Sequence, residues 1–381
     1  MQWMFRAING KEAQMVRYIL ASVESGLRLE RRCPQCRRGN ARIHSGLRHR
    51  PLSDLKVQSI PQRRMLCPWC GLTWTLRPAG VEAGDQRSRR LMEIGVVLYM
   101  FGLSYRAVEK FLPLLECRGS KSSIERDVAG AGHQARELHR EAPGMRVRVL
   151  GVDGTGAAMA GKEAGVLFFV ALDDGRLVAV EPLQEEQTQQ VRRHVRRVLA
   201  QVQAQELRTD EHSVYEGIVP EGVHRLCLTH WRKSKGQRAY ELHRQAVAED
   251  RPLEAQSLQE LLGLLRKQPR APTVPEALSR LVVRYINART GLAWKVNQLL
   301  QHVERTWPKV SNDPRDPTNN ATERLIGLTF KSPTRHSRFG DGAIRAKTMR
   351  GFKALHKVLA HPYLAFLLRG EAGVCDLRKV I

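Results

Sequence analysis

The sequence predicts a mixed α/β protein whose main domain is preceded by two small segments of different character. From residue 145 onward, apolar strand patterns alternate with helical patterns, as in an α/β domain. Upstream, two CxxC pairs lie within residues 30–77 and three short helical patterns lie within residues 85–140. Residues 1–29 form an N-terminal segment and residues 361–381 a C-terminal tail, to which we assign no element.

Composition sets the class of partner. The 381 residues carry 63 Lys+Arg against 38 Asp+Glu, a net charge of +25, and the basic residues are dispersed over the chain. Such an excess favours a polyanionic partner, either DNA or a ribosomal particle. The hydrophobic fraction of 42% is typical of a globular protein. The sequence has no apolar run of membrane-spanning length and no secretory signal. We therefore expect a cytoplasmic protein with no membrane partner.

Residues 30–77 predict a zinc ribbon. Cys33 and Cys36 form the first CxxC pair, and Cys67 and Cys70 form the second. Four thiolates on two tight turns suit the tetrahedral coordination of structural Zn²⁺. A redox role would require a thioredoxin-like surrounding for each pair, which the sequence does not indicate. The odd total of 7 cysteines also disfavours a disulfide framework.

Residues 85–140 predict three helices joined by tight turns, a pattern typical of a helix-turn-helix. The third is expected to begin with Ser122 as N-cap in a capping box. Lys121, Ser123 and Arg126 would then lie at the start of a recognition helix and bind DNA. A helical spacer without a DNA-binding role is the alternative.

Residues 145–360 predict the α/β domain itself. Two apolar runs joined by "DDGR" indicate a hairpin with an Asp-Gly turn. Three antiparallel strands, a long helix, and then short strands alternating with helices describe a ribonuclease-H-like core of the retroviral integrase superfamily. Residues at about 232–310 are helical in pattern and interrupt this core as an all-helical insertion.

Three acidic residues are candidates for a metal site. Asp153 follows the expected central strand, Asp210 ends a later strand, and Glu323 lies near the start of a helix, where the helix dipole favours an anion. Each also has an ordinary explanation: a strand-end turn, a loop carboxylate, and a capping box with Asn320 as N-cap. Hard oxygen ligands of this kind hold two Mg²⁺ ions about 4 Å apart in phosphodiester chemistry.

Four motifs carry a resemblance to a known family. They are "GVDGTG" around Asp153, "LRTDEHSVY" around Asp210, "CLTH" with Cys227 and His230, and "NNATER" around Glu323. In these motifs, and in the helical insertion before the glutamate, the chain resembles bacterial insertion-sequence transposases of the DDE class. Its catalytic part is similar to the Mutator-like group.

The resemblance implies a DNA transposase that works as a homodimer on double-stranded DNA, in the bacterial cytoplasm at the nucleoid. It would bind terminal inverted repeats, cut the element ends with two Mg²⁺ ions (Mn²⁺ as a substitute), and join the freed 3′-hydroxyls to target DNA. Asp153, Asp210 and Glu323 would be the metal ligands. A domesticated transposase acting as a DNA-binding regulator, or a nuclease of the same fold without strand transfer, are the alternatives.

Two further groups of residues complete the expected site. The resemblance implies that Cys227 and His230, with Asn319 and Asn320, shape the site beside the metals, although such Cys and His residues are also common in cores. A cationic stretch follows the glutamate, and its basic side chains are candidates for phosphate contacts or simply form a solvated face. These are Lys331, Arg335, Arg338, Lys347 and Arg350.

Overall fold

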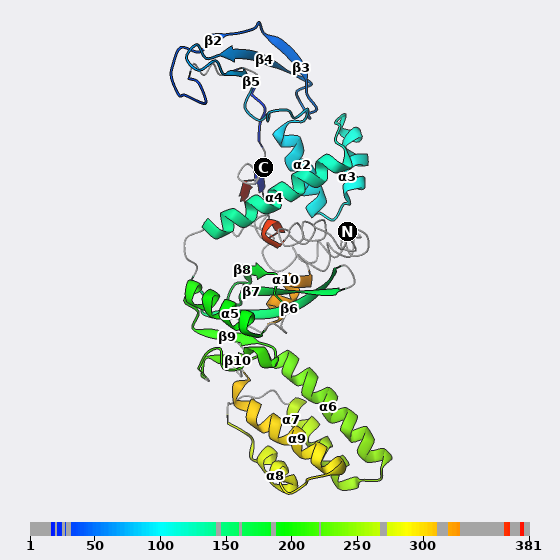
Figure 1. Cartoon of the computed structure of the whole chain (residues 1–381). Coiled ribbons are helices and arrows are strands. Elements are labelled where there is room, and N and C mark those ends of the chain that lie inside the picture. The colour runs from blue at the N-terminus through cyan, green and yellow to red at the C-terminus, as the bar shows by residue number, and fades with distance from the viewer. Residues whose placement is uncertain are drawn as a thin grey trace. The chain divides into compact units, whose positions relative to one another are not determined.

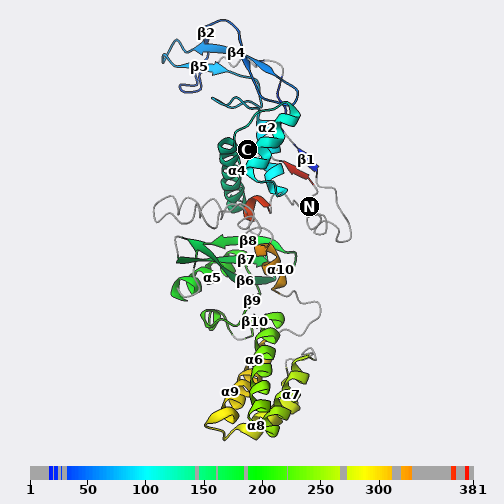
Figure 2. The ribbon, with the colours of Figure 1, turned by 90° about the vertical axis from the view of Figure 1, so that its right-hand side faces the viewer.

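The computed structural model describes residues 17–19, 21–24, 27, 32–141, 146–159, 162–183, 188–220, 222–266, 273–310, 319–327, 362–365 and 374–376. These residues divide into two compact units. Unit 1 holds the described chain up to Glu141 and the C-terminal pieces from 362 onward, and unit 2 holds residues 146–327. Figures 1 and 2 show the elements of both units. No described helix is both long and apolar enough to cross a membrane.

Unit 1 begins with a small antiparallel sheet around the cysteines. β4 is its longest strand and pairs antiparallel with β2, β3 and β5, so every hydrogen-bonded pair in this sheet involves β4. Separately, β1 and β11, which lie far apart in the sequence, pair in parallel. The strands are β1 (Arg17–Ile19), β2 (Arg42–Ile43), β3 (Arg48–Pro51), β4 (Ser59–Leu66), β5 (Thr73–Leu76) and β11 (Val374–Asp376).

Three helices follow the sheet, as the sequence predicts: α2 (Arg89–Met100), α3 (Tyr105–Phe111) and α4 (Lys121–Glu141). Ser88 and Ser104 cap the first two, each accepting a hydrogen bond from a backbone N–H three residues later. The predicted cap of the third helix was wrong. Ser120 accepts from the N–H of Ser123, so α4 begins at Lys121 and Ser122 lies inside its first turn.

The connection from α3 to α4 differs from the expected tight turn. It spans residues 112–120 and includes the 3₁₀ turn η1 (Leu112–Leu115) and Glu116 in a left-handed conformation. Of the predicted DNA-binding residues here, Lys121 and Arg126 are exposed and Ser123 is half-buried. They lie in the first two turns of α4, so their position is as expected, while DNA binding stays a prediction.

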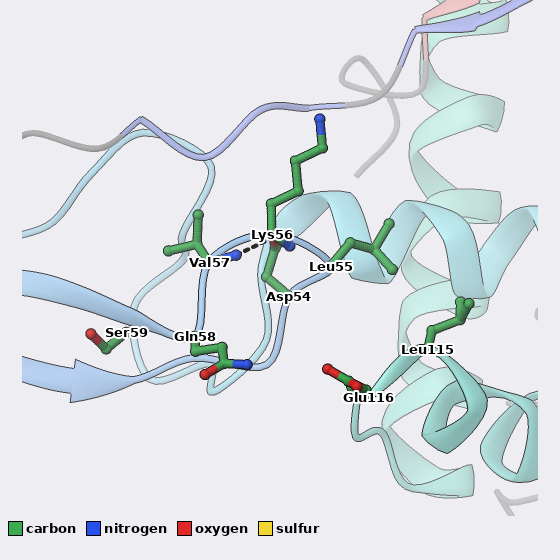
Figure 3. A pocket seen from close by; sticks show the side chains of 8 residues that line it. All are labelled: Asp54, Leu55, Lys56, Val57, Gln58, Ser59, Leu115 and Glu116. Carbon is green, nitrogen blue, oxygen red and sulfur yellow. Dashed lines mark hydrogen bonds between the residues drawn. The ribbon is translucent and has the colours of Figure 1, made fainter.

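A buried carboxylate joins the small sheet to the helices. Asp54, in the loop between β3 and β4, accepts hydrogen bonds from the backbone N–H groups of Lys56 and Val57 and from the hydroxyl of Ser88. It also forms an ion pair with Arg90 of α2. Burial opposes ionisation of Asp54, but these partners outweigh it and lower the pKa of the carboxyl below 3.8. Figure 3 shows this loop beside a cavity of about 450 Å³.

We expect Asp54→Asn to destabilise unit 1 by about 3 kcal/mol at neutral pH, because it leaves Arg90 without its charge partner in a largely buried position. A lowered pKa stabilises the fold above the ordinary value of 3.8 and ceases to do so as the pH falls through the lowered value. The difference from wild type should therefore shrink in acid. Denaturant unfolding at about pH 7 and about pH 3 measures both effects.

Glu82→Gln is the matched control for Asp54→Asn, since Glu82 pairs with Arg89 at 3.7 Å while its side chain stays 55% exposed. We expect it to cost no more than about 0.5 kcal/mol. An equal loss in the two variants would contradict the role of Asp54 in joining the sheet to the helices.

Unit 2 is built on a mixed five-stranded sheet of order β10-β9-β6-β7-β8. β6, β7 and β8 are successive antiparallel strands, while β9 and β10 run parallel to β6. The predicted hairpin is confirmed, because β7 and β8 flank a turn at Asp173–Gly175, and the mixed α/β class is confirmed with it. The strands are β6 (Val149–Met159), β7 (Lys162–Ala171), β8 (Arg176–Glu181), β9 (Glu206–Thr209) and β10 (His224–Leu226).

Helices cover both faces of this sheet. α5 (Thr188–Val202) buries the apolar stripe Val191, Val195, Val198 and Val202 against Leu150 and Val152 of β6. The intervening residue Gly151 faces the opposite side, where the short helix α10 (Asn320–Ile326) lies. Because both faces are covered, β7, which lies next to the central strand β6, is an unbroken apolar run from Val166 to Ala171.

Between β10 and α10 the chain forms a separate helical bundle with its own core. The predicted insertion is present, but it begins earlier than residue 232, because α6 starts directly after β10. Trp231 donates from its indole N–H to the hydroxyl of Thr306 at 2.8 Å, which ties the two ends of the bundle together. Its helices are α6 (Leu228–Ala248), α7 (Pro252–Arg266), α8 (Glu276–Tyr285), α9 (Gly291–Thr306) and the 3₁₀ turn η3 (Trp307–Lys309).

Candidate active site

The strand register brings two of the predicted carboxylates into one row. Gly151 of β6 pairs with Arg208 of β9, and Arg208 pairs in turn with Arg225 of β10. Asp153, Asp210 and Cys227 follow these three positions by two residues each in the chain. Neighbouring strands lie about 4.8 Å apart, and equivalent positions of parallel strands face the same side. Asp210 and Cys227 therefore lie directly after β9 and β10, whereas the predicted strand-end position of Asp153 was wrong, because β6 continues past it in its pairing with β7.

Helix α10 lies against the same row through Asn319, which precedes it. The Asn319 side chain is fully buried, donates to the carbonyl of Val152 at 3.2 Å, and accepts from the hydroxyl of Thr322 at 2.8 Å. A Cβ on Gly151 would come within 2.8 Å of the Asn319 carbonyl oxygen, so the glycine permits this close approach. These contacts fix the start of α10 one residue from Asp153.

The predicted cap of α10 was wrong. Asn320 is the first helical residue and is exposed, while Asn319 occupies the N-cap position and makes no side-chain capping bond. The reason is that the Asn319 amide is engaged with the sheet instead. Glu323 lies one turn into the helix, and its carboxylate forms an ion pair with the imidazole of His230 on α6. Glu323 thus lies beside the start of α6, and its binding of a metal stays a prediction.

Cys227 stands at the β10 end of this row, and His230, three residues later on α6, pairs with Glu323. His230 accepts a proton more readily than usual: its pKa is raised to about 9 by the hydrogen bond to Cys227 and by the negative charges of Cys227, Glu323 and Asp153, against an opposing effect of burial. Burial would raise the pKa of the Cys227 thiol, but His230 and the backbone N–H of Asn319 outweigh it and lower that pKa. His230 therefore carries positive charge at the centre of the acidic residues.

A further polar cluster, which the sequence did not predict, holds the loop after β9. Glu211, next to Asp210, accepts from His302 of α9 at 2.5 Å and pairs with Lys235 of α6 at 2.6 Å. Burial opposes ionisation of Glu211, but hydrogen bonds from His302 and Lys235 outweigh it and lower the pKa of Glu211. We call Glu211, Lys235 and His302 the Glu211 cluster. It attaches the Asp210 loop to the helical insertion.

We expect Glu211→Gln to destabilise unit 2 by about 3 kcal/mol, because it leaves the buried ammonium of Lys235 without a charged partner. The double variant Glu211→Gln with Lys235→Met should recover much of this loss, since no unpaired charge stays buried. Denaturant unfolding of both variants, with Glu260→Gln on an exposed position of α7 as control, measures the coupling. A double variant no more stable than Glu211→Gln alone would contradict the ion pair.

The three carboxylates are more widely spaced than the ligands of a single ion. In the described part of the chain, the four cysteines are the only group of three or more such ligands whose atoms lie within 4.8 Å of one another. Two ions about 4 Å apart allow wider spacing, because the ligands divide between them. Mg²⁺ prefers carboxylate oxygens as ligands, so the chemical type of these three side chains suits the predicted ions.

The four predicted zinc ligands do come together. The Sγ atoms of Cys33 and Cys70 lie 3.6 Å apart, as do those of Cys36 and Cys67. Tetrahedral Zn–S bonds of about 2.3 Å place sulfurs about 3.8 Å apart, which matches. In each CxxC turn the first cysteine makes the same two backbone hydrogen bonds with residues four and five positions later. The cluster can hold a structural zinc ion.

Electrostatics within this cluster favour a cation. Burial raises the pKa of Cys67, but backbone N–H groups of Cys70 and Trp69 outweigh it and lower the pKa to about 6. The N–H of Leu72 favours the thiolate of Cys70, yet burial and the neighbouring thiols raise its pKa to about 12. Four thiols this close therefore ionise together only when a metal balances their charge.

The basic residues predicted after Glu323 are outside the described residues. They are Lys331, Arg335, Arg338, Lys347 and Arg350. Their contacts with phosphates stay a prediction from the sequence.

No protein-family model matches the chain, and a search of curated proteins finds no similar sequence.

Proposed function

We propose that this protein is a DDE-class DNA transposase with a ribonuclease-H-like catalytic domain. The observation that carries the proposal is the row of Asp153 and Asp210 across parallel strands, with Glu323 on the helix beside it. Three carboxylates from distant parts of a chain repel one another unless cations neutralise them. Their shared location, with Asp153 inside β6, Asp210 just after the neighbouring β9 and Glu323 on the adjacent helix, is hard to explain by turns and caps alone.

The topology supports the fold assignment. If β6, β7, β8, β9 and β10 are numbered 1 to 5 in chain order, they lie side by side in the order 3-2-1-4-5. β7, number 2, is the one strand of this sheet that runs antiparallel to the other four. The core expected from the sequence has three antiparallel strands, a helix and then short strands alternating with helices, with the carboxylates at two strand ends and on a later helix. In the structure, Asp153 lies on the first strand, Asp210 directly after the fourth and Glu323 on the later helix. The helical insertion lies before that helix, as the resemblance implies.

The residues of the site have distinct roles in this proposal. Asp153, Asp210 and Glu323 hold two Mg²⁺ ions, for which Mn²⁺ can substitute; when bound, the ions activate the attacking oxygen and stabilise the leaving oxygen. His230 orients the Glu323 carboxylate. Asn319 sets α10 against β6. Cys227, which contacts His230 and Asn319, fixes their relative position.

Unit 1 would provide the DNA contacts of the transposase. The four-cysteine cluster would hold zinc and stabilise the small sheet, while α4 would present Lys121, Ser123 and Arg126 to a terminal repeat. The net charge of +25 supports binding to double-stranded DNA. A homodimer acting at the bacterial nucleoid accords with the pairing of two element ends.

The test uses the intact protein with the DNA that flanks its gene. Labelled duplexes carrying the imperfect inverted repeats are incubated with Mg²⁺ and a target plasmid. We expect nicks at the repeat ends and joined products that link the labelled end to the plasmid.

Three other outcomes contradict the proposal in different ways. Specific binding without cutting indicates a domesticated regulator, and cutting without joined products indicates a nuclease. An absence of inverted repeats beside the gene also counts against transposition.

A further inference from the structure

A polar groove of about 580 Å³ adjoins the candidate active site in unit 2. One wall is the loop Asp210–His212, and the other is the exposed face of α6. His230, at the start of α6, also lines the groove and pairs with Glu323, so the groove opens onto the acidic residues. We call it the α6 groove.

The two walls of the α6 groove are fixed to each other. Glu211 lies in the groove beside Asp210 and pairs with Lys235, which is buried on the same helix that forms the opposite wall. His302 holds the second oxygen of Glu211 from α9. Because a charged cluster joins loop and helix, the groove is part of the folded structure and does not depend on surface side chains meeting by chance.

The α6 wall presents hydrogen-bond donors in one line. Lys233, Ser234, Gln237 and Arg238 recur at helical spacing, so they share a face of α6. Lys233 and Arg238 are exposed, and no carboxylate of the described residues pairs with Lys233. An ammonium, a hydroxyl, an amide and a guanidinium in sequence are the side chains that contact phosphate and sugar oxygens of a DNA backbone.

We propose that the α6 groove binds the DNA strand that carries the phosphodiester to be cut, with Lys233 and Arg238 on its phosphates. This inference rests on the proposed function and names the path by which the substrate enters that site. The strand would run along the first three turns of α6 toward Asp210 and His230. Figure 1 shows that α6 leads away from the end of β10 into the helical bundle.

One acidic residue of the groove, Glu241, is paired with a proposed phosphate-binding residue, so its removal is expected to tighten DNA binding. Glu241 accepts from Gln237 at 3.1 Å and pairs with Arg238 at 3.5 Å, with both charged side chains about half exposed. Such exposed pairs contribute little to stability, so a phosphate can replace Glu241 on Arg238 at small cost. Glu241 thus competes with DNA for the same donors.

Two basic variants test the phosphate contacts. Binding of a duplex of about 30 base pairs with a single-stranded 3′ extension is measured by fluorescence anisotropy without divalent cations. We expect Lys233→Gln and Arg238→Gln each to weaken binding about five-fold and to make the logarithmic salt dependence less steep by about one. Arg244 is an exposed basic residue of α6 outside the groove, so Arg244→Gln is the control. It should change neither the DNA affinity nor its salt dependence clearly.

An acidic pair of variants tests the competition. Glu241→Gln should tighten DNA binding. Glu249→Gln should not, because Glu249 is an exposed carboxylate just after the end of α6 and outside the groove. Both remove one negative charge, so a general electrostatic effect would act equally on them. Thermal unfolding of every variant checks that the fold is unchanged.

The outcomes separate this inference from the proposed function. If Lys233→Gln and Arg238→Gln match Arg244→Gln, or Glu241→Gln matches Glu249→Gln, the α6 groove does not bind DNA, even where the wild type cuts element ends. If the effects appear only with single-stranded RNA, the DNA assignment is overturned. If the effects appear with DNA although the wild type never cuts it, the groove stands and the transposase proposal fails.

Discussion

Asp153→Asn and Glu323→Gln are each expected to lower the rate of DNA cleavage by roughly a thousandfold while leaving DNA affinity nearly unchanged. Each replaces a metal-ligating oxygen by an amide without changing side-chain size. Because Asp153 repels Asp210 but attracts the positively charged His230, the Asp153 variant should differ little from wild type in thermal stability. Single-turnover cleavage, equilibrium DNA binding and thermal unfolding measure the three properties separately.

Asp174→Asn and Glu276→Gln are the matched controls for these variants. Asp174 lies in the β7–β8 turn, where it accepts from the N–H of Arg176, and the side chain of Glu276 is 85% exposed on α8. Both remove a carboxylate of the same length from unit 2 and should cut DNA at the wild-type rate. Retained cleavage by either active-site variant would refute the assignment of that residue.

Removal of zinc should unfold the sheet of unit 1. Among the described residues, the apolar cluster beside this sheet has Leu52, Ile60 and Val81 as its buried members, which is too small a core to hold a fold on its own. Structural zinc sites contribute about 10 kcal/mol or more to folding in small domains. Chelation is therefore expected to abolish the unfolding transition of residues 30–77 and expose them to protease, as is Cys36→Ser.

The control for zinc removal is Cys117→Ala, which alters a buried thiol outside the four-cysteine cluster. It should cost about 1 kcal/mol through a small cavity and leave the zinc content at one ion per chain. An unchanged melting and proteolysis profile after chelation would remove zinc from the account of unit 1.

The features that the sequence predicted correctly are local in origin. The Asp-Gly turn between β7 and β8 follows from backbone preferences, and the CxxC turns aim each pair of thiols at one point. The placement of Asp210 directly after β9 follows from a strand pattern that stops there, whereas Asp153, predicted to end its strand, lies inside β6. Periodicity and turn chemistry suffice for such features.

The features that were missed depend on contacts between distant residues. Asn319 does not cap its helix because its amide meets the carbonyl of Val152, 167 residues earlier in the chain. Glu211 and His302 are 91 residues apart, and only the folded bundle brings them together. Val81, between the small sheet and α2, packs with Leu52 and Ile60, 29 and 21 residues earlier in the chain. Local sequence signals carry no information about such pairs.

The central claim is that Asp153, Asp210 and Glu323 together bind divalent cations. Anomalous diffraction from crystals of the intact protein containing Mn²⁺ tests it most directly, since the ion can be located independently of activity. We expect ion density within about 2.2 Å of oxygens from all three side chains, and its loss in Asp153→Asn. Mn²⁺ bound elsewhere, or bound without Glu323, would contradict the account.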